Sequence, residues 1–200
     1  MCLAAVSGFG QTRDRAVGPG TCVTVTLAQR LPMSDAETHI VGDQLTRIWR
    51  QQDVHVIVRF GDTLSGKGRL RLVLSSAGVD AEGSMSNLCT LGSIRFVDGR
   101  PDPELTVNVV AAREFVRRAH PEILPAVQTL MAARIAGRAA AHELGHYLLE
   151  DTAHRRSGLM RARFDGADLL GGRLDAFAPP DRAEVAAGLS RAGEDCSSDR

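Results

Sequence analysis

The segment from Pro125 to Leu149 constrains the fold of this chain more than any other stretch. It is rich in alanine and leucine, has no proline after its first residue, and contains one glycine before the residues HELGH near its end. This composition is typical of a long helix. We therefore predict a helix over Pro125–Leu149, the longest in the chain, with HELGH in its C-terminal part.

The spacing within HELGH predicts a metal site. His142 and His146 are four residues apart, so they share one helix face and both imidazoles can reach one ion. Glu143 lies about 100° around the helix, which is poor for a ligand but close enough to hold a water on that ion. Zinc lowers the pKa of such a water towards ~7, and a nearby carboxylate can take its proton during attack on a carbonyl. The motif thus predicts a Zn²⁺ site with Glu143 as general base.

A catalytic zinc also needs a third protein ligand and an open position. Glu150, Asp151 and His154 follow the helix closely and are the candidates. Ligands at i, i+4 and i+8 diverge along a helix axis, whereas a chain that turns back after Leu149 can deliver a more distant residue. Because imidazole is the commoner partner for two histidines, we predict His154 as the third ligand and keep the two acids as alternatives.

These residues resemble the metzincin clan of zinc peptidases, whose pattern is HExxHxxGxxH followed by a Met-turn. The matching residues are His142, Glu143, His146, His154 and, within SGLMR, Met160. Here the third histidine follows the second by eight residues instead of six, and Leu149 stands where the clan has glycine. We therefore expect the helix to run on slightly and the chain after it to loop wider. The resemblance implies that Met160 forms a hydrophobic floor beneath the metal; otherwise it is an ordinary core methionine.

The resemblance also implies the fold class. We expect an α+β, zincin-like fold: a twisted mixed β-sheet with a backing helix and a long active-site helix, followed by an irregular C-terminal subdomain with a short final helix. Residues 1–20 are expected to be a flexible lead-in. Residues 21–200 would form a single catalytic domain, with an upper part over about 21–149 and a lower part over about 150–200.

Local patterns place the other elements. Alternating apolar residues predict strands at 22–27, 54–60 and 69–74, the last two with one apolar face each. A capping box at Ser34 and Glu37 begins a helix over about 35–51, and a final helix is expected over about 181–191. Two further strands, 93–97 and 106–110, are separated by the turn-rich DGRPDP. If the resemblance holds, 93–97 is the candidate edge strand that pairs with an extended substrate; an internal strand is the alternative.

Composition excludes several classes of protein. The 200 residues carry 24 basic and 24 acidic side chains, so no basic field for nucleic acid is expected, and no apolar run is long enough for a membrane span. The cysteines (Cys2, Cys22, Cys89 and Cys196) form no CxxC pair, which argues against a cysteine-built zinc ribbon. The chain start lacks the basic region of a secretory signal. The residues do not decide the compartment, and we favour a secreted or periplasmic location over a cytoplasmic one.

A local basic cluster lies beside the predicted cleft. It consists of Arg155, Arg156, Arg161 and Arg163. Such a run is ordinarily a solvated surface, and recognition of an acidic side chain or a substrate carboxylate is the alternative.

Taken together, the motif predicts a monomeric zinc-dependent metallopeptidase, an endopeptidase that acts on a peptide or protein substrate. Two alternatives remain open at this point. One is a non-catalytic zinc-binding module, and the other is a zinc hydrolase of a non-peptide amide.

Overall fold

The structure is a computed structural model that describes residues 21–61, 70–76, 91–171, 177–180 and 182–192. The predicted lead-in, 1–20, lies outside these residues. Of the four cysteines the structure describes Cys22, which is buried in the first strand and disulfide-bonded. The elements in chain order are β1 (Thr21–Gln29), α1 (Asp35–Arg50), β2 (Val54–Phe60), β3 (Leu70–Ser75), β4 (Gly92–Val97), β5 (Arg100–Asn108), α2 (Val109–Ala119), α3 (Pro125–Leu149), α4 (Gly166–Leu170) and α5 (Arg182–Ala192).

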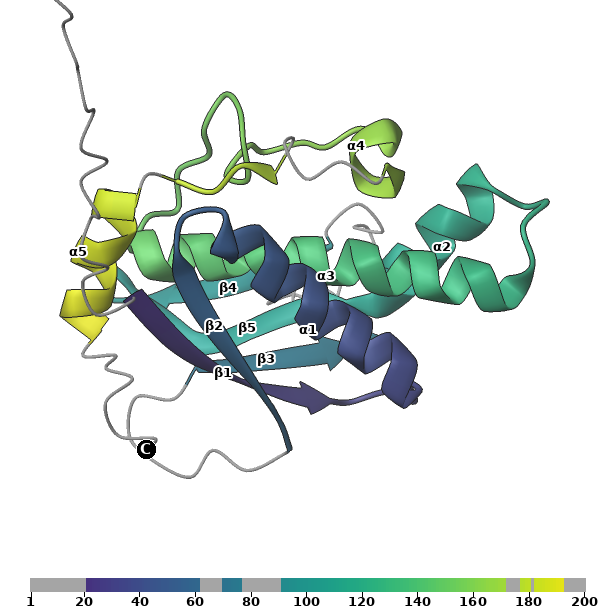
Figure 1. Cartoon of the computed structure of the whole chain (residues 1–200), viewed down its shortest axis with the longest axis horizontal. Coiled ribbons are helices and arrows are strands. Elements are labelled where there is room, and N and C mark those ends of the chain that lie inside the picture. Colours follow the sequence, from purple (N-terminus) through teal and green to yellow (C-terminus); the bar gives the residue numbers. More distant parts are fainter. Residues whose placement is uncertain (1–20, 62–69, 77–90, 172–176, 181, 193–200) are drawn as a thin grey trace, which may run out of the picture.

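The strands form one five-stranded mixed sheet in the order β2-β1-β3-β5-β4 (Figure 1). Strands β2, β1, β3 and β5 run parallel to one another, and β4 runs antiparallel to β5 at the edge of the sheet. The mixed sheet was predicted, and of the two alternatives left open for 93–97 the structure has the edge strand. The direction of β4 follows from its connection, since Asp98 and Gly99 both have positive φ angles, 52° and 75°. Two such residues make the tight turn that joins antiparallel neighbours.

The prediction that DGRPDP separates two strands is wrong beyond its first two residues. β5 begins at Arg100 and runs through Pro101 and Pro103. Proline lacks the N–H that a central strand needs, but β5 pairs with β3 only from Glu104 onwards. The two prolines therefore lie where β5 has β4 as its one neighbour among the described residues.

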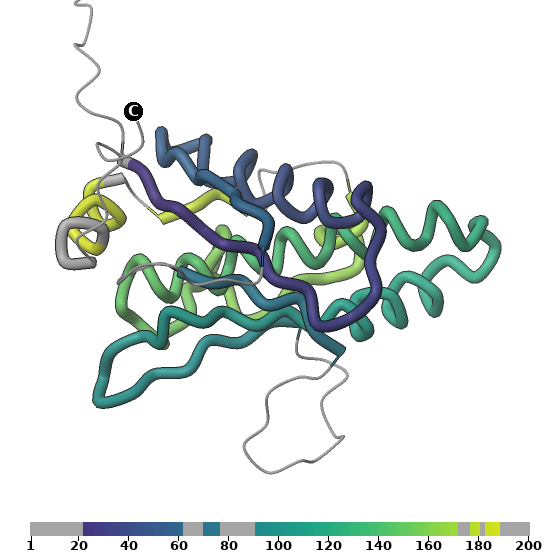
Figure 2. Tube along the Cα trace, turned by 90° about the horizontal axis from the view of Figure 1, so that it is seen from below, coloured from purple at the N-terminus to yellow at the C-terminus, as the bar shows by residue number. Residues whose placement is uncertain are grey.

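The predicted strand 106–110 also ends too late. β5 stops at Asn108, whose side-chain oxygen accepts a hydrogen bond from the Ala111 N–H at 2.9 Å. Because this bond satisfies a free donor of the first helical turn, it begins α2, a helix that was not predicted. Figures 1 and 2 show α2 and the start of α3 as a hairpin that projects beyond the sheet.

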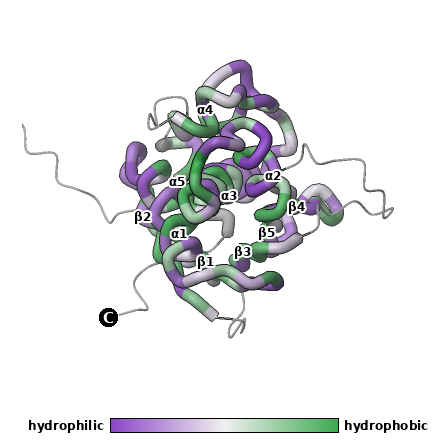
Figure 3. Tube along the Cα trace, turned by 90° about the vertical axis from the view of Figure 1, so that its right-hand side faces the viewer, coloured by the Kyte–Doolittle hydropathy of each residue, from purple (hydrophilic) through white to green (hydrophobic). Residues whose placement is uncertain are grey.

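α3 is the central element of the molecule. It has the predicted bounds and lies between the sheet and the segment that carries α4, with α1 alongside (Figure 3). One cluster of buried apolar residues extends from β1 to α5. It includes the residues through which α1 and α3 pack against each other. Trp49 is fully buried in it, and its indole N–H donates to the Ala141 carbonyl at 3.2 Å. No described helix is both long enough and apolar enough to cross a bilayer.

The contact between α1 and α3 depends on a glycine. A Cβ atom at Gly137 would lie 2.6 Å from the Gln44 Cβ and 2.7 Å from the Val41 carbonyl oxygen. We expect Gly137→Ala to destabilise the protein by about 2 kcal/mol, because the two helix backbones would have to move apart. Gly42→Ala is the matched control: its Cβ would meet Val58 at an ordinary 3.4 Å, and alanine favours a helix by ~1 kcal/mol. Urea unfolding measures both changes, and equal stability of the two variants would contradict the prediction.

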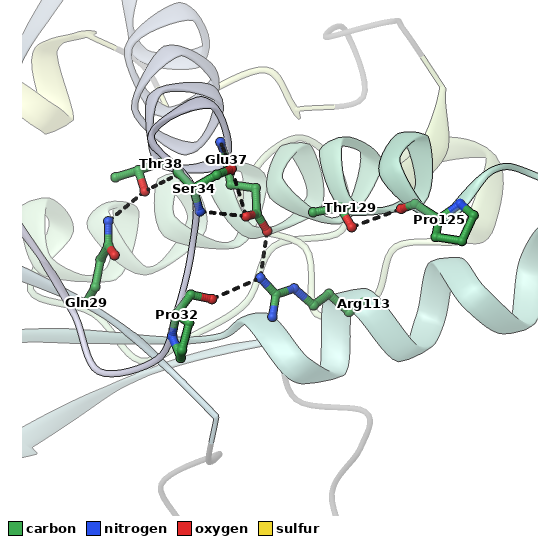
Figure 4. A network of polar contacts seen from close by, with 8 residues as sticks. All are labelled: Gln29, Pro32, Ser34, Glu37, Thr38, Arg113, Pro125 and Thr129. Atoms are coloured by element: carbon green, nitrogen blue, oxygen red, sulfur yellow. Dashed lines mark hydrogen bonds and ion pairs between the residues drawn. The ribbon is translucent and has the colours of Figure 1, made fainter.

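A buried carboxylate joins the start of α1 to α2 (Figure 4). Glu37 completes the predicted capping box by accepting from the Ser34 N–H at 2.8 Å. It also accepts from the Arg113 guanidinium at 2.6 Å, and that guanidinium donates to the Pro32 carbonyl as well. Burial raises the pKa of Glu37, but the hydrogen bonds from Ser34 and Arg113 outweigh it, so the pKa lies below its ordinary value.

This network predicts a pH-dependent loss of stability in Glu37→Gln. At pH 7 we expect a loss of about 1–2 kcal/mol, kept modest because Arg113 is one-third exposed. A carboxylate with a lowered folded pKa stabilises fully above its unfolded pKa and loses this effect as the pH falls through the folded value. The difference between wild type and variant should therefore shrink from pH 7 to pH 3 in urea unfolding. Glu114→Gln, on an exposed cluster, should change stability much less; a pH-independent difference for Glu37→Gln would contradict the argument.

Candidate metal centre

Three histidines meet at the C-terminal end of α3. His142 and His146 lie on α3 and His154 lies in the chain that follows, and one ligand atom from each lies within 4.8 Å of the others. The Nε2 atoms of His142 and His146 are 3.1 Å apart. The structure thus brings together the three residues predicted as ligands, in an arrangement that can hold a metal ion.

The other ring nitrogens of the two helical histidines face backbone carbonyls. His142 Nδ1 lies 2.7 Å from the Leu159 oxygen, and His146 Nδ1 lies 2.6 Å from the Asp151 oxygen. A carbonyl only accepts, so each Nδ1 carries the proton and each Nε2 presents its lone pair. Two lone pairs at this separation repel each other unless a cation lies between them. The hydrogen bonds therefore prepare both Nε2 atoms for a metal.

Burial keeps these two imidazoles neutral. It lowers the pKa of His142 to about 4, and it also lowers the pKa of His146, with the nearby His154 acting in the same direction. Metal ligation requires the unprotonated ring, so both side chains are in the binding form near pH 7. Together with His154 they make a set of three imidazoles, which suits zinc.

The chain reverses at Glu150 to bring this arrangement about. Glu150 has φ 51° and ψ 37°, the left-handed conformation that ends many helices. The Asp151 N–H then bonds to the His146 carbonyl, and the Asp151 carbonyl accepts from the His146 ring. As expected, α3 runs on slightly: its last residue is Leu149, at the position where the metzincin pattern has glycine, and the left-handed residue is the next one. A glutamate, not a glycine, adopts the left-handed turn.

Neither acidic alternative joins the group of histidines. The Asp151 carboxylate instead accepts from the Ala153 N–H at 2.8 Å, which fixes the turn towards His154. Glu150 is exposed at the helix end. Within the described residues, the group with ligand spacing contains the three histidines and no carboxylate.

Met160 packs directly against α3. It is 1% exposed, and a Cβ atom at Gly145 would lie 2.2 Å from its sulfur. The glycine within HELGH therefore makes room for the methionine. The loop that carries Met160 is held by a hydrogen bond from the Arg155 N–H to the Met160 carbonyl and by one from the Leu159 N–H to Ala178. The packing is apolar, but it does not by itself give Met160 a functional role.

Glu143 is buried beside the histidines. It is 6% exposed, and burial raises the pKa of its carboxyl group to about 8. Its side chain packs against the first residue of β4, since a Cβ atom at Gly92 would lie 2.8 Å from the Glu143 Cγ and Oε1 atoms. Sequence reasoning missed Gly92, although a glycine in a strand often marks such a close approach.

A cleft of about 1120 Å³ opens in front of these residues. Its walls come from β4, α2, α3 and the chain after Met160, and both Glu143 and the three histidines line it. On the wall formed by the chain after Met160, Phe164 and Phe177 stack with ring centroids 4.7 Å apart. The Phe164 ring lies edge-on to His142. The cleft therefore combines a polar centre with apolar walls, as ligand sites commonly do.

Arg138 fixes the segment that carries α4, which forms part of the cleft wall, to α3. Sequence reasoning missed this residue too. It is 3% exposed and donates to the carbonyls of Asp168, Leu169 and Gly171 at 2.5–2.7 Å. These carbonyls lie at the C-terminal end of α4, where free acceptors collect. Burial lowers the pKa of the Arg138 guanidinium.

Comparisons with known proteins add little. No family model matches the chain, and no curated protein sequence matches it. Among solved structures, the crystal structure of archaemetzincin from Methanopyrus kandleri is similar, with 17% sequence identity and a TM-score of 0.45. The similarity covers 88% of this chain and 97% of that chain. A similarity of this size establishes neither family nor function.

Proposed function

We propose that this protein is a zinc-dependent metallopeptidase, an endopeptidase, whose zinc is held by His142, His146 and His154. The observation that carries the proposal is the convergence of these three imidazoles in a cleft that also contains a buried carboxylate, Glu143. When bound, zinc would supply a Lewis acid that activates water and polarises the scissile carbonyl.

Glu143 would move the protons of this reaction. A general base works best when its pKa lies near the operating pH, and burial raises the pKa of Glu143 to about 8. The carboxylate would accept a proton from the attacking water and return it to the amine that leaves. The packing of β4 on Glu143 would hold the carboxylate in place and exclude bulk solvent.

β4 would bind the substrate backbone. One side of this strand pairs with β5, and its other side has no strand neighbour within the described part of the chain. An extended peptide can add to such an edge through main-chain hydrogen bonds. Because this pairing needs no chain terminus, it favours an endopeptidase.

The two other candidate functions are weaker. A structural zinc site usually closes with a fourth protein ligand, whereas the group described here contains three residues next to a buried acid. An amide hydrolase for small substrates has no need of a strand edge beside the site.

Hydrolysis assays on the purified protein test this function. Casein, a mixed peptide library and a set of non-peptide amides would be incubated with the zinc-loaded protein, the chelated protein and the chelated protein with zinc restored. We expect internal cleavage of peptides that is lost on chelation and restored by zinc. Cleavage of the non-peptide amides alone would favour the hydrolase, and zinc-dependent folding without any hydrolysis would favour the binding module.

A further inference from the structure

The structure separates the four arginines of the basic cluster. Arg155 donates to Glu184 at 2.8 Å, and it lines a second, smaller cavity instead of the cleft. Arg161 pairs with Asp168, and its guanidinium lies 4.4 Å from the centre of the Phe164 ring. Both of these cations are already engaged in contacts within the protein.

Arg163 differs from its neighbours. It is exposed, it lines the same cleft as the three histidines, and it has no carboxylate partner among the described residues. Arg156 is also exposed but does not line the cleft. Of the four arginines, Arg163 therefore combines an available guanidinium with a position facing the proposed substrate.

The rest of the cleft adds positive charge. Arg118 of α2 also lines the cleft, and it shares the single carboxylate of Glu114 with Arg117. Arg138 is held by carbonyl groups, which leave its charge unneutralised. The described lining of the cleft contains four arginines against two acids, Glu114 and Glu143, and this excess of positive charge attracts a negatively charged group.

Resting on the peptidase function proposed above, we infer that Arg163 is a specificity residue that binds a carboxylate of the substrate peptide. A guanidinium presents paired N–H donors that match the two oxygens of a carboxylate. The carboxylate can come from an aspartate or glutamate side chain or from a free C-terminus. The apolar ring of Phe164, at the next position, would lie beside the stem of such a residue.

Quenched fluorescent peptides test this inference. Each peptide would carry a single glutamate, glutamine or lysine at one position on either side of the scissile bond, with a free or an amidated C-terminus. Zinc-loaded wild type, Arg163→Ala, Arg163→Glu and the matched control Arg156→Ala would be compared. Binding of the same peptides to Glu143→Gln and to Glu143→Gln/Arg163→Ala would be measured by calorimetry, which needs no turnover.

We expect wild type and Arg156→Ala to prefer the glutamate peptide over its glutamine counterpart by about tenfold in kcat/KM at one position. In Arg163→Ala the ratio of the glutamate peptide to the glutamine peptide should fall towards one. In Arg163→Glu the order of preference should reverse, so that the lysine peptide is cleaved better than the glutamate peptide. A preference that instead follows the free C-terminus would assign the carboxylate to the chain end.

The outcomes separate this inference from the function on which it rests. Cleavage without any carboxylate preference, or a preference that survives in Arg163→Ala because the carboxylate binds the metal, overturns the role of Arg163. Absence of all cleavage overturns the peptidase. In that case calorimetry still tests the role of Arg163. The glutamate peptide should bind more tightly than the glutamine peptide to Glu143→Gln, and this difference should disappear in Glu143→Gln/Arg163→Ala; any other result overturns the role of Arg163.

Discussion

Replacing Glu143 by glutamine should lower kcat/KM for peptide hydrolysis by at least about 100-fold while the protein keeps its zinc. Glutamine matches the size of the buried carboxylate, so the packing against Gly92 is preserved. It cannot accept the proton of the attacking water. The histidines are untouched, so the affinity for zinc should change little.

Two measurements on the same samples check this prediction. Zinc content after dialysis should match that of wild type, and hydrolysis of a cleaved reporter peptide should be lost. Glu150→Gln is the matched control, because Glu150 lies seven residues further along the chain and outside the cleft. Wild-type activity in Glu143→Gln would refute the assigned mechanism, and loss of zinc would show that the side chain is itself a ligand.

His154→Ala should weaken zinc binding by at least about 100-fold. The variant removes one of three ligand atoms that lie within 4.8 Å of one another, and two imidazoles hold zinc poorly on their own. His154 is exposed, so its loss should hardly affect the core. Competition with a chelator of known affinity measures the change.

Glu150→Ala and Asp151→Ala are the controls for the third ligand. Neither carboxylate joins the histidine group, so both variants should bind zinc within a fewfold of wild type. Strong binding by His154→Ala together with weak binding by either control would transfer the role of third ligand to that acid.

The elements that could be predicted from sequence are those with strong local patterns. Pro125–Leu149 has helix-forming residues throughout, and Ser34 with Glu37 forms the capping box that begins α1. α4 has the same kind of signal, because Asp165 and Asp168 cap its first turn reciprocally, but a helix of five residues is too short for a periodic apolar pattern. The mixed sheet was predicted by resemblance, whereas its strand order depends on contacts between distant segments.

The pair of histidines on α3 could be predicted because helix geometry alone determines their spacing. The position of His154 could not, since it depends on the left-handed turn at Glu150 and on the Asp151 carboxylate that orders the following residues. The walls of the cleft were harder still. Gly92 and Arg138 act through contacts with residues 30 to 51 positions away, and one sequence carries no periodic signal for such contacts.

The carbonyl groups of Asp151 and Leu159 orient the two imidazoles of α3 by hydrogen bonds. Both carbonyls belong to the chain that turns back along α3 after the helix ends. A designer who transplanted only the helix into another scaffold would carry over two ligands without the acceptors that set their tautomers. The smallest portable unit of this site is therefore the helix together with its return loop through Met160.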